Sequence, residues 1–229
     1  MTDIIIALDF SDPEEALDLA QTLKNETTWV KVGLELFTRS GPEVITRLKA
    51  MGLSVFLDLK FMDIPNTVSG ATSACVAAGA DMITLHTLGG KKMIQAALAA
   101  RDRAGRGKNK PKLVGVTLLT SMDKEDLPWP DSRTTDEIVL DLAGKGMKWG
   151  LDGCVCSGLE AGMIRKNTAD DFCLITPGIR TENSGDDQKR IVTPDQASKA
   201  GADFLVIGRP VTGSPDPVQS LRDIRSLLT

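Results

Sequence analysis

Two acids and one lysine lie close together in the segment FLDLKFMDIPNT, which spans residues 56–67. Asp58 and Lys60 follow the apolar run Leu53–Leu57, which predicts a buried strand, and side chains two residues apart in a strand project from the same face. Asp63 follows where the strand is expected to have become a loop. Because nearby carboxylates favour the charged form of an amine, the pattern is typical of a lysine that delivers a proton. The alternative is a rim salt bridge that merely tolerates burial.

Other polar residues stand within or just after further predicted strands. They are Asp9, Lys31, His86, Thr120, Ser121, Ser157, Arg180 and Arg209, the last of which follows Gly208. Lys31 has the alternative of pointing out of the sheet and extending past a helix to solvent. Asp9 has the alternative of capping a helix that begins near Pro13, although Ser11 and Asp12 are better placed for that role. The only histidine, His86, is interpreted as a hydrogen-bonded structural residue.

The residues after the last two predicted strands favour a phosphate site. TPGIR and IGRP each combine a glycine, which lets backbone N–H groups approach a ligand, with an arginine that can hold phosphate by paired hydrogen bonds. With no tyrosine and one histidine in the chain, lysine and carboxylates must transfer protons. The acids around Lys60 are a poor Mg²⁺ site because the ammonium between them repels a cation. We therefore expect no metal and a phosphorylated substrate.

The composition, with 41% hydrophobic and 25% charged residues, is typical of a soluble globular protein. A net charge of −4 argues against nucleic-acid binding, and the one basic run, Arg101–Lys110, is interpreted as a solvated loop after a helix. The sequence begins without the pattern of a signal peptide, so we expect no export. It also lacks a stretch of about 18 apolar residues, so we expect no membrane span. Four cysteines without a CxxC pair predict buried thiols in a reducing compartment. We expect a cytoplasmic protein with neither nucleic acid nor membrane as partner.

Short apolar runs alternate with segments of helical spacing, such as Glu14–Leu23 and Val44–Met51. Eight runs predict strands: Ile4–Leu8, Trp29–Val32, Val55–Leu57, Met82–Leu85, Leu113–Leu119, Cys154–Val155, Cys173–Ile175 and Phe204–Ile207. Eight repeats in 229 residues give about 29 residues each, close to one βα unit. Strict alternation leaves a doubly wound sheet or a barrel, and eight units favour an α/β fold with a single-domain (β/α)8 TIM barrel over residues 1–229.

Glycines and two long polar segments mark the turns of this repeat. Gly52, Gly79, Gly150 and Gly201 stand where helices are expected to end, and AGAD occurs twice before a strand, at Ala78–Asp81 and Ala200–Asp203. The segments Ser121–Asp136 and Arg180–Thr193 follow the fifth and seventh predicted strands. They lie on the side where barrel enzymes carry their active sites, so they are interpreted as lids or, alternatively, as tolerated insertions.

Taken in order, several motifs resemble the orotidine 5′-phosphate decarboxylase family, and the resemblance covers nearly the whole chain. These are ALDF, KVGLELF, FLDLKFMDIPNT, TPGIR, DDQKRIVTP and IGRP. The D-x-K-x-x-D pattern is shared with sugar-phosphate decarboxylases and aldolases of similar barrels, whereas DIPNT, TPGIR and the DDQ segment make the resemblance specific. One departure is Met62, where bacterial members usually have histidine; if strand alternation persists it points away from Asp58 and Lys60.

The resemblance implies decarboxylation of orotidine 5′-phosphate to UMP by a homodimer without metal or organic cofactor. Lys60 would protonate the pyrimidine carbon that loses CO₂, within an array of Lys31, Asp58, Lys60 and Asp63. Asp63 and Thr67 would cross from the partner subunit. The implied substrate-binding residues are Asp9, Lys31, Ile64, Thr67, Thr120, Arg180, Gln188, Gly208 and Arg209. Two alternatives stay open: a sister enzyme that uses Mg²⁺ and an enediolate, and a catalytically silent barrel that binds a phosphorylated ligand.

Overall fold

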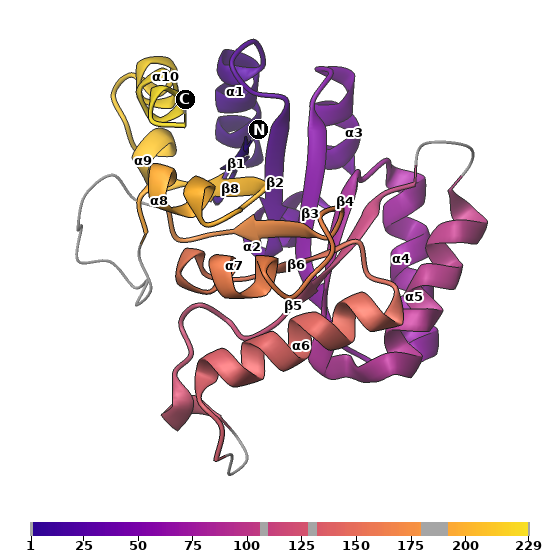
Figure 1. Ribbon diagram of the computed structural model, residues 1–229. Helices are drawn as coiled ribbons and strands as arrows, with labels where there is room; N and C mark the ends of the chain where they lie inside the picture. Colours follow the sequence, from indigo (N-terminus) through magenta and orange to yellow (C-terminus); the bar gives the residue numbers. More distant parts are fainter. Residues whose placement is uncertain (1, 106–109, 128–131, 180–191, 229) are drawn as a thin grey trace.

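Parallel strands form the centre of the computed structural model, which describes residues 2–105, 110–127, 132–179 and 192–228 (Figure 1). Each strand pairs with the next in sequence, and the first pairs with the eighth, so the sheet closes into a barrel. The strands are β1 (Asp3–Ala7), β2 (Trp29–Gly33), β3 (Ser54–Phe61), β4 (Met82–His86), β5 (Lys112–Val116), β6 (Gly153–Val155), β7 (Cys173–Thr176) and β8 (Phe204–Ile207). The predicted (β/α)8 TIM barrel is therefore confirmed.

Helices surround the barrel and connect its strands (Figure 1). They are α1 (Pro13–Leu23), α2 (Leu34–Ser40), α3 (Glu43–Ala50), α4 (Pro65–Ala78), α5 (Gly90–Ala104), α6 (Thr135–Trp149), α7 (Gly158–Arg165), α8 (Pro194–Lys199), α9 (Arg209–Thr212) and α10 (Pro217–Ser226), with the short 3-10 helices η1 (Thr87–Gly89) and η2 (Lys124–Asp126). Asp12 caps α1 by accepting a hydrogen bond from the Glu14 N–H, so Asp9 is free of that role. In the described part of the chain, no helix is long and apolar enough to cross a membrane.

The barrel wall separates two apolar cores. The inner one fills the barrel with side chains that include Ile5, Phe56, Met82, Val114 and Ile175. The larger one lies between the strands and the helices. Because every strand is buried on both faces, the strands read in the sequence as continuous apolar runs, as expected for a parallel sheet.

Three aspartates repeat one arrangement at the amino-terminal end of the barrel. Each follows a glycine with positive φ (Gly79, Gly150 or Gly201) by two residues and binds one cation and one strand N–H. The three sets are Asp81 Oδ2 with Lys49 Nζ (2.6 Å) and Val55 N (2.7 Å), Asp152 Oδ2 with Arg101 Nη1 (2.6 Å) and Leu113 N (2.7 Å), and Asp203 Oδ2 with Arg165 Nη2 (2.6 Å) and Leu174 N (2.7 Å). We call these sets the floor clamps. The two AGAD strings contain two of them, and GLD at 150–152 is the third.

Several predicted boundaries differ from the structure. The fifth strand ends at Val116 rather than Leu119, and the third continues to Phe61, beyond the predicted end at Leu57. The basic run predicted as a loop begins inside α5, because Arg101 belongs to the helix and pairs with Asp152. Residues 106–109 of that run and most of the predicted lid Arg180–Thr193 lie outside the described residues.

Candidate active site

A cavity of about 580 Å³ opens at the carboxyl end of the strands. Its volume is in the range typical of small-molecule sites. The predicted residues that line it are Asp9, Lys31, Asp58, Lys60, Thr120, Ser121, Gly208 and Arg209, joined by Pro177, Gly178 and Thr212. Residues far apart in sequence therefore meet in one cavity, as predicted from their shared position at strand ends.

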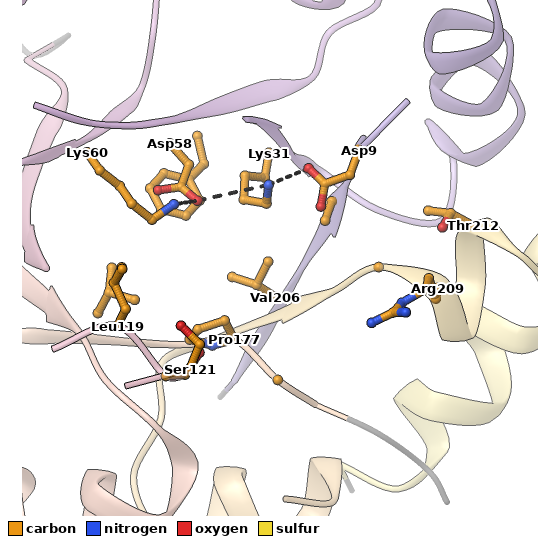
Figure 2. Close-up of a pocket in the computed structure, with 16 residues that line it drawn as sticks. Asp9, Lys31, Asp58, Lys60, Leu119, Ser121, Pro177, Val206, Arg209 and Thr212 are labelled. Carbon is orange, nitrogen blue, oxygen red and sulfur yellow. Dashed lines mark hydrogen bonds and ion pairs between the residues drawn. The ribbon is translucent and has the colours of Figure 1, made fainter. Parts of the chain in front are cut away.

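Acids and lysines alternate along one wall of this cavity (Figure 2). Lys60 Nζ lies 2.8 Å from Asp58 Oδ2, which lies 3.9 Å from Lys31 Nζ. Lys31 Nζ in turn lies 2.7 Å from Asp9 Oδ1. Arg209 and Thr212 lie farther along the cavity, beyond Asp9 (Figure 2). We call the four residues Asp9, Lys31, Asp58 and Lys60 the mouth group.

Lys31 points into the barrel mouth, which excludes the alternative of a lysine that extends outward to solvent. Its side chain is only 10% exposed. Gly33, two residues further along β2, makes room for this lysine: a Cβ there would lie 3.0 Å from Asp9 Oδ1 and 3.1 Å from Lys31 Nζ. A side chain at this position would therefore disturb the pair.

Asp58 and Lys60 share the cavity, but regular strand alternation does not bring them there. Leu57 pairs with Ile83 and Phe61 with Leu85, so the register shifts and three residues of β3 lie opposite Thr84. Lys60 has a φ of +52°, the only positive φ of a non-glycine residue in the described part of the chain. A bulge with a left-handed residue re-aims a side chain, and such strain clusters at functional sites. The prediction was right about placement and wrong about its cause.

Thr84 and Thr212 are near the site and were not predicted from the sequence. Thr84 donates a hydrogen bond to Asp58 Oδ1 (3.1 Å) and accepts one from the Lys60 N–H (2.8 Å). The signal for Thr84 is period two in β4, since Met82 fills the barrel interior and Thr84 is the next residue on that face. Thr212 follows the Gly208–Arg209 pair by one helical turn.

Three predicted residues lie outside the cavity and two outside the described part of the chain. Asp63, Ile64 and Thr67 are exposed at the start of α4, and Asp63 Oδ1 accepts a hydrogen bond from the Ile64 N–H at 2.6 Å. None of them lines the cavity in this single chain. Arg180 and Gln188 fall in residues 180–191, which the structure does not describe.

His86, at the end of β4, leaves one ring nitrogen without the hydrogen bond expected of a structural histidine, as far as the described residues go. Its Nδ1 is buried without a partner in the described part of the chain. Removal from water lowers the pKa of His86 below its usual range, the positive charge of Lys60 lowers it further, and Asp58 acts in the opposite direction. The electrostatic influence of Lys60 and Asp58 shows that His86 belongs to the surroundings of the mouth group.

No cluster of three or more potential metal-ligating His, Cys, Asp or Glu residues occurs among the described residues. The acid deepest in the cavity, Asp58, is already bound by Lys60 at 2.8 Å and by Thr84 at 3.1 Å. A cation at Asp58 would meet the two ammonium groups of Lys60 and Lys31. The charges of this wall therefore suit an anionic or neutral ligand better than a metal ion.

Comparisons with known proteins agree with this geometry. The chain is 50% identical over 224 residues to orotidine 5′-phosphate decarboxylase of Maridesulfovibrio salexigens, covering 98% of this chain and 97% of that protein. It is 51% identical over 221 residues to the same enzyme of Nitrosomonas eutropha, covering 96% and 94%. The crystal structure of orotidine 5′-phosphate decarboxylase from Lactobacillus acidophilus is 35% identical, with a TM-score of 0.86 and complete coverage of both chains.

A protein of Geobacillus kaustophilus, described in its crystal structure as an uncharacterized conserved protein, is 33% identical with a TM-score of 0.87 and covers 99% of this chain. The model of the orotidine 5′-phosphate decarboxylase / HUMPS family matches residues 2–224. With this match, and with relatives of about half-identical sequence over nearly their whole length, the chain belongs to the orotidine 5′-phosphate decarboxylase / HUMPS family.

Proposed function

We propose that the chain decarboxylates orotidine 5′-phosphate to UMP and CO₂ in pyrimidine biosynthesis, without a metal or an organic cofactor. The observation that carries the proposal is the Lys60 ammonium, 2.8 Å from Asp58 in a cavity that also contains Gly208 and Arg209. This combination offers a proton donor at one end and phosphate ligands at the other. The family and the half-identical decarboxylases favour this reaction over other chemistry of the same barrel.

The reaction breaks one carbon–carbon bond and forms one carbon–hydrogen bond. The bond between C6 of the pyrimidine and its carboxylate breaks, the electron pair stays on C6, and CO₂ leaves. Lys60 then donates a proton to the carbanion at C6 and takes one back from solvent. Asp9 and Lys31 would hold the ribose, Thr120 the pyrimidine, and Gly208 and Arg209 the phosphate. Arg180 and Gln188 would complete the phosphate end from the segment that the structure does not describe.

Proton donation alone does not account for the rate that such an enzyme needs. General acid catalysis contributes about 10²–10⁴-fold, whereas enzymes accelerate reactions by roughly 10⁶–10¹⁷-fold. The remainder must come from charges fixed before the reaction and from phosphate binding energy that is used in the transition state. The alternating charges of Lys31, Asp58 and Lys60 are the preorganised part of this proposal.

The second candidate is a Mg²⁺-dependent enzyme that acts on a sugar phosphate, since the family name also includes the HUMPS branch. The two lysines beside Asp58 disfavour it, because their ammonium groups would repel a cation there. Turnover decides between them. We expect UMP from orotidine 5′-phosphate in excess EDTA, and no reaction with 3-keto-gulonate 6-phosphate or hexulose 6-phosphate with Mg²⁺.

A Lys60→Met variant, purified in parallel, is the matched control for contamination by the host's own decarboxylase. UMP formed equally by both proteins would come from the host. If the wild-type protein forms no UMP, two alternatives remain: the Mg²⁺-dependent enzyme and the catalytically silent barrel that binds a phosphorylated ligand.

We further propose a homodimer in which Asp63 and Thr67 reach the partner's cavity. Large apolar side chains are exposed just after three neighbouring strands: Leu34 (58%) at the start of α2 after β2, Met62 (56%) and Ile64 (67%) after β3, and Leu88 (36%) in η1 after β4. An exposed apolar patch of this kind is typical of an interaction surface. Met62, in place of the histidine of other bacterial members, suits such an interface.

The crossing of Asp63 can be tested by mixing inactive chains. A Lys60→Ala chain and an Asp63→Ala chain would form heterodimers with one intact site, and random mixing would restore about a quarter of the wild-type activity. The control mixture of Lys60→Ala with Asp58→Ala restores none, since both residues serve the cavity of their own subunit. Heterodimers of the first pair that stay inactive would show that Asp63 does not cross.

The remaining proposals concern the whole chain. All four cysteines are free, and Cys75, Cys154 and Cys156 are buried. Burial raises the pKa of the Cys75 thiol to about 11. Such inert thiols support a reducing compartment such as the cytoplasm. The closed barrel supports one domain over residues 1–229, as expected from the repeat.

A further inference from the structure

Thr84 joins the two residues of β3 on which the proposed chemistry depends. It lies on β4, is fully buried, and faces the bulge of β3. Its hydroxyl accepts a hydrogen bond from the Lys60 N–H (2.8 Å) and donates one to Asp58 Oδ1 (3.1 Å). A hydroxyl has one proton and two lone pairs, so it makes both bonds at once.

The hydrogen bond between the Lys60 N–H and the Thr84 hydroxyl stabilises an unfavourable backbone conformation of Lys60. A left-handed φ is unfavourable for a residue with a side chain and persists only where surrounding structure imposes it. Thr84 stands opposite the three residues Asp58, Leu59 and Lys60 of β3, where the register with β4 shifts. Its hydroxyl is therefore placed to fix the direction in which the Lys60 side chain leaves the strand.

The bond to Asp58 fixes the second half of the pair. Asp58 Oδ2 binds Lys60 Nζ at 2.8 Å, and Thr84 binds the other oxygen, Oδ1. A carboxylate held at both oxygens cannot turn about its Cβ–Cγ bond without losing a hydrogen bond. Thr84 thus fixes both the plane of the carboxylate and the backbone from which the ammonium extends.

We propose that Thr84 is a positioning residue, whose hydroxyl sets the geometry of Asp58 and Lys60 for proton delivery to the substrate. This inference rests on the proposed decarboxylation. It goes beyond that function because Thr84 does not line the cavity and is not expected to contact substrate. Misplacement of a reacting group by about 1 Å costs an enzyme on the order of 100-fold in rate, which sets the size of the expected effect.

The test compares Thr84→Val with Thr84→Ser. Valine keeps the shape and removes both hydrogen bonds, whereas serine keeps the hydroxyl. We expect Thr84→Val to lower kcat by about 10- to 100-fold with KM within about twofold of wild type, because positioning acts on the chemical step. Thr84→Ser should retain kcat within about threefold. A merely structural role would not separate kcat from KM in this way.

Thr87→Val is the matched control, since Thr87 is also buried beside β4 and its hydroxyl has no partner among the described residues. It should leave kcat unchanged. If Thr84→Val does not fold, Thr84→Ala against Thr84→Ser decides, with alanine expected to be the slower by the same factor.

The inference would be overturned if Thr84→Val kept the wild-type kcat, or if Thr84→Ser were as impaired as Thr84→Val or Thr84→Ala. In either case an active wild-type protein would still uphold the proposed function. A wild-type protein without decarboxylase activity would overturn both.

Discussion

Pairs of aspartate with a cation occur at both ends of the barrel, at nearly equal distances. In the floor clamps each Asp Oδ2 lies 2.6 Å from a lysine or arginine nitrogen, and at the mouth Asp58 Oδ2 lies 2.8 Å from Lys60 Nζ. The second partner differs. Each floor aspartate also accepts a hydrogen bond from a strand N–H at 2.7 Å, whereas Asp58 accepts one from the hydroxyl of Thr84.

This difference separates stabilising pairs from those available for chemistry. A floor aspartate satisfies a backbone donor of the neighbouring strand, so its removal leaves that donor without a partner. The mouth group is bound by side chains alone and lines a cavity, so its removal leaves the strand ladder intact. The distance within an ion pair therefore does not by itself identify a functional site. The second hydrogen-bond donor to each carboxylate, a backbone N–H or a side chain, does.

The largest effect is expected at Lys60. Replacement by methionine keeps the length of the side chain but removes the proposed proton donor. We expect kcat to fall by at least about 10²–10⁴-fold, with the urea midpoint of unfolding little changed. Steady-state assays and urea titration of the same preparation measure both. Retained turnover would remove Lys60 from the mechanism.

The next effect is expected at Arg209, at the proposed phosphate end of the cavity. Hydrogen bonds to charged groups contribute about 1.5–3 kcal/mol, so Arg209→Gln should lower kcat/KM by roughly 10- to 150-fold. Arg165→Gln, which removes the cation of a floor clamp, is the matched control and should leave KM unchanged. Equal changes in KM in the two variants would contradict the division between the two ends.

A smaller effect, on stability alone, is expected at the floor. Asp203→Ala removes the acceptor of the Leu174 N–H and the partner of Arg165. Leaving a buried donor unsatisfied costs about 1–3 kcal/mol, and each kcal/mol lowers the Tm of a chain of this size by about 2–4 °C. Calorimetry should show this loss while kcat stays within about twofold. A large loss of kcat would mean that the floor contributes to chemistry.

The smallest effect is a dependence of stability on pH through His86. Its pKa is lowered in the folded state from the usual 6.5, so the unfolded state binds the proton first as the pH falls. The contribution of neutral, buried His86 to the free energy of unfolding is complete above about pH 6.5 and is lost as the pH falls below that value. Between about pH 7.5 and 5.5, His86→Gln should lose less stability than wild type, by under about 1.4 kcal/mol per pH unit. Parallel slopes would contradict this.

The barrel was predictable from sequence because parallel strands buried on both faces leave unmistakable apolar runs. The glycines predicted to end helices also behave as expected, since Gly52, Gly79, Gly150 and Gly201 all have positive φ. Strand ends were less predictable. Val116 ends β5 although apolar residues continue to Leu119, because hydrophobicity shows burial and not hydrogen-bonded pairing.

Site residues at strand ends were predictable because the closed barrel brings all carboxyl ends together. The bulge at Lys60 was not, since a left-handed lysine has no signature like that of glycine. The role of Thr84 was not predictable, because threonine is common in strands and a single threonine in an apolar strand indicates no special function. Its role depends on a register shift between β3 and β4, which only the structure reveals.

The contrast between mouth and floor is tested most directly by one matched pair, Asp58→Ala and Asp152→Ala, with kcat and the free energy of unfolding measured for both. We predict that Asp58→Ala lowers kcat by more than about 100-fold and leaves stability nearly unchanged. Asp152→Ala should lose about 1–3 kcal/mol of stability and keep its activity. Two variants that lose activity and stability in the same proportion would contradict the account.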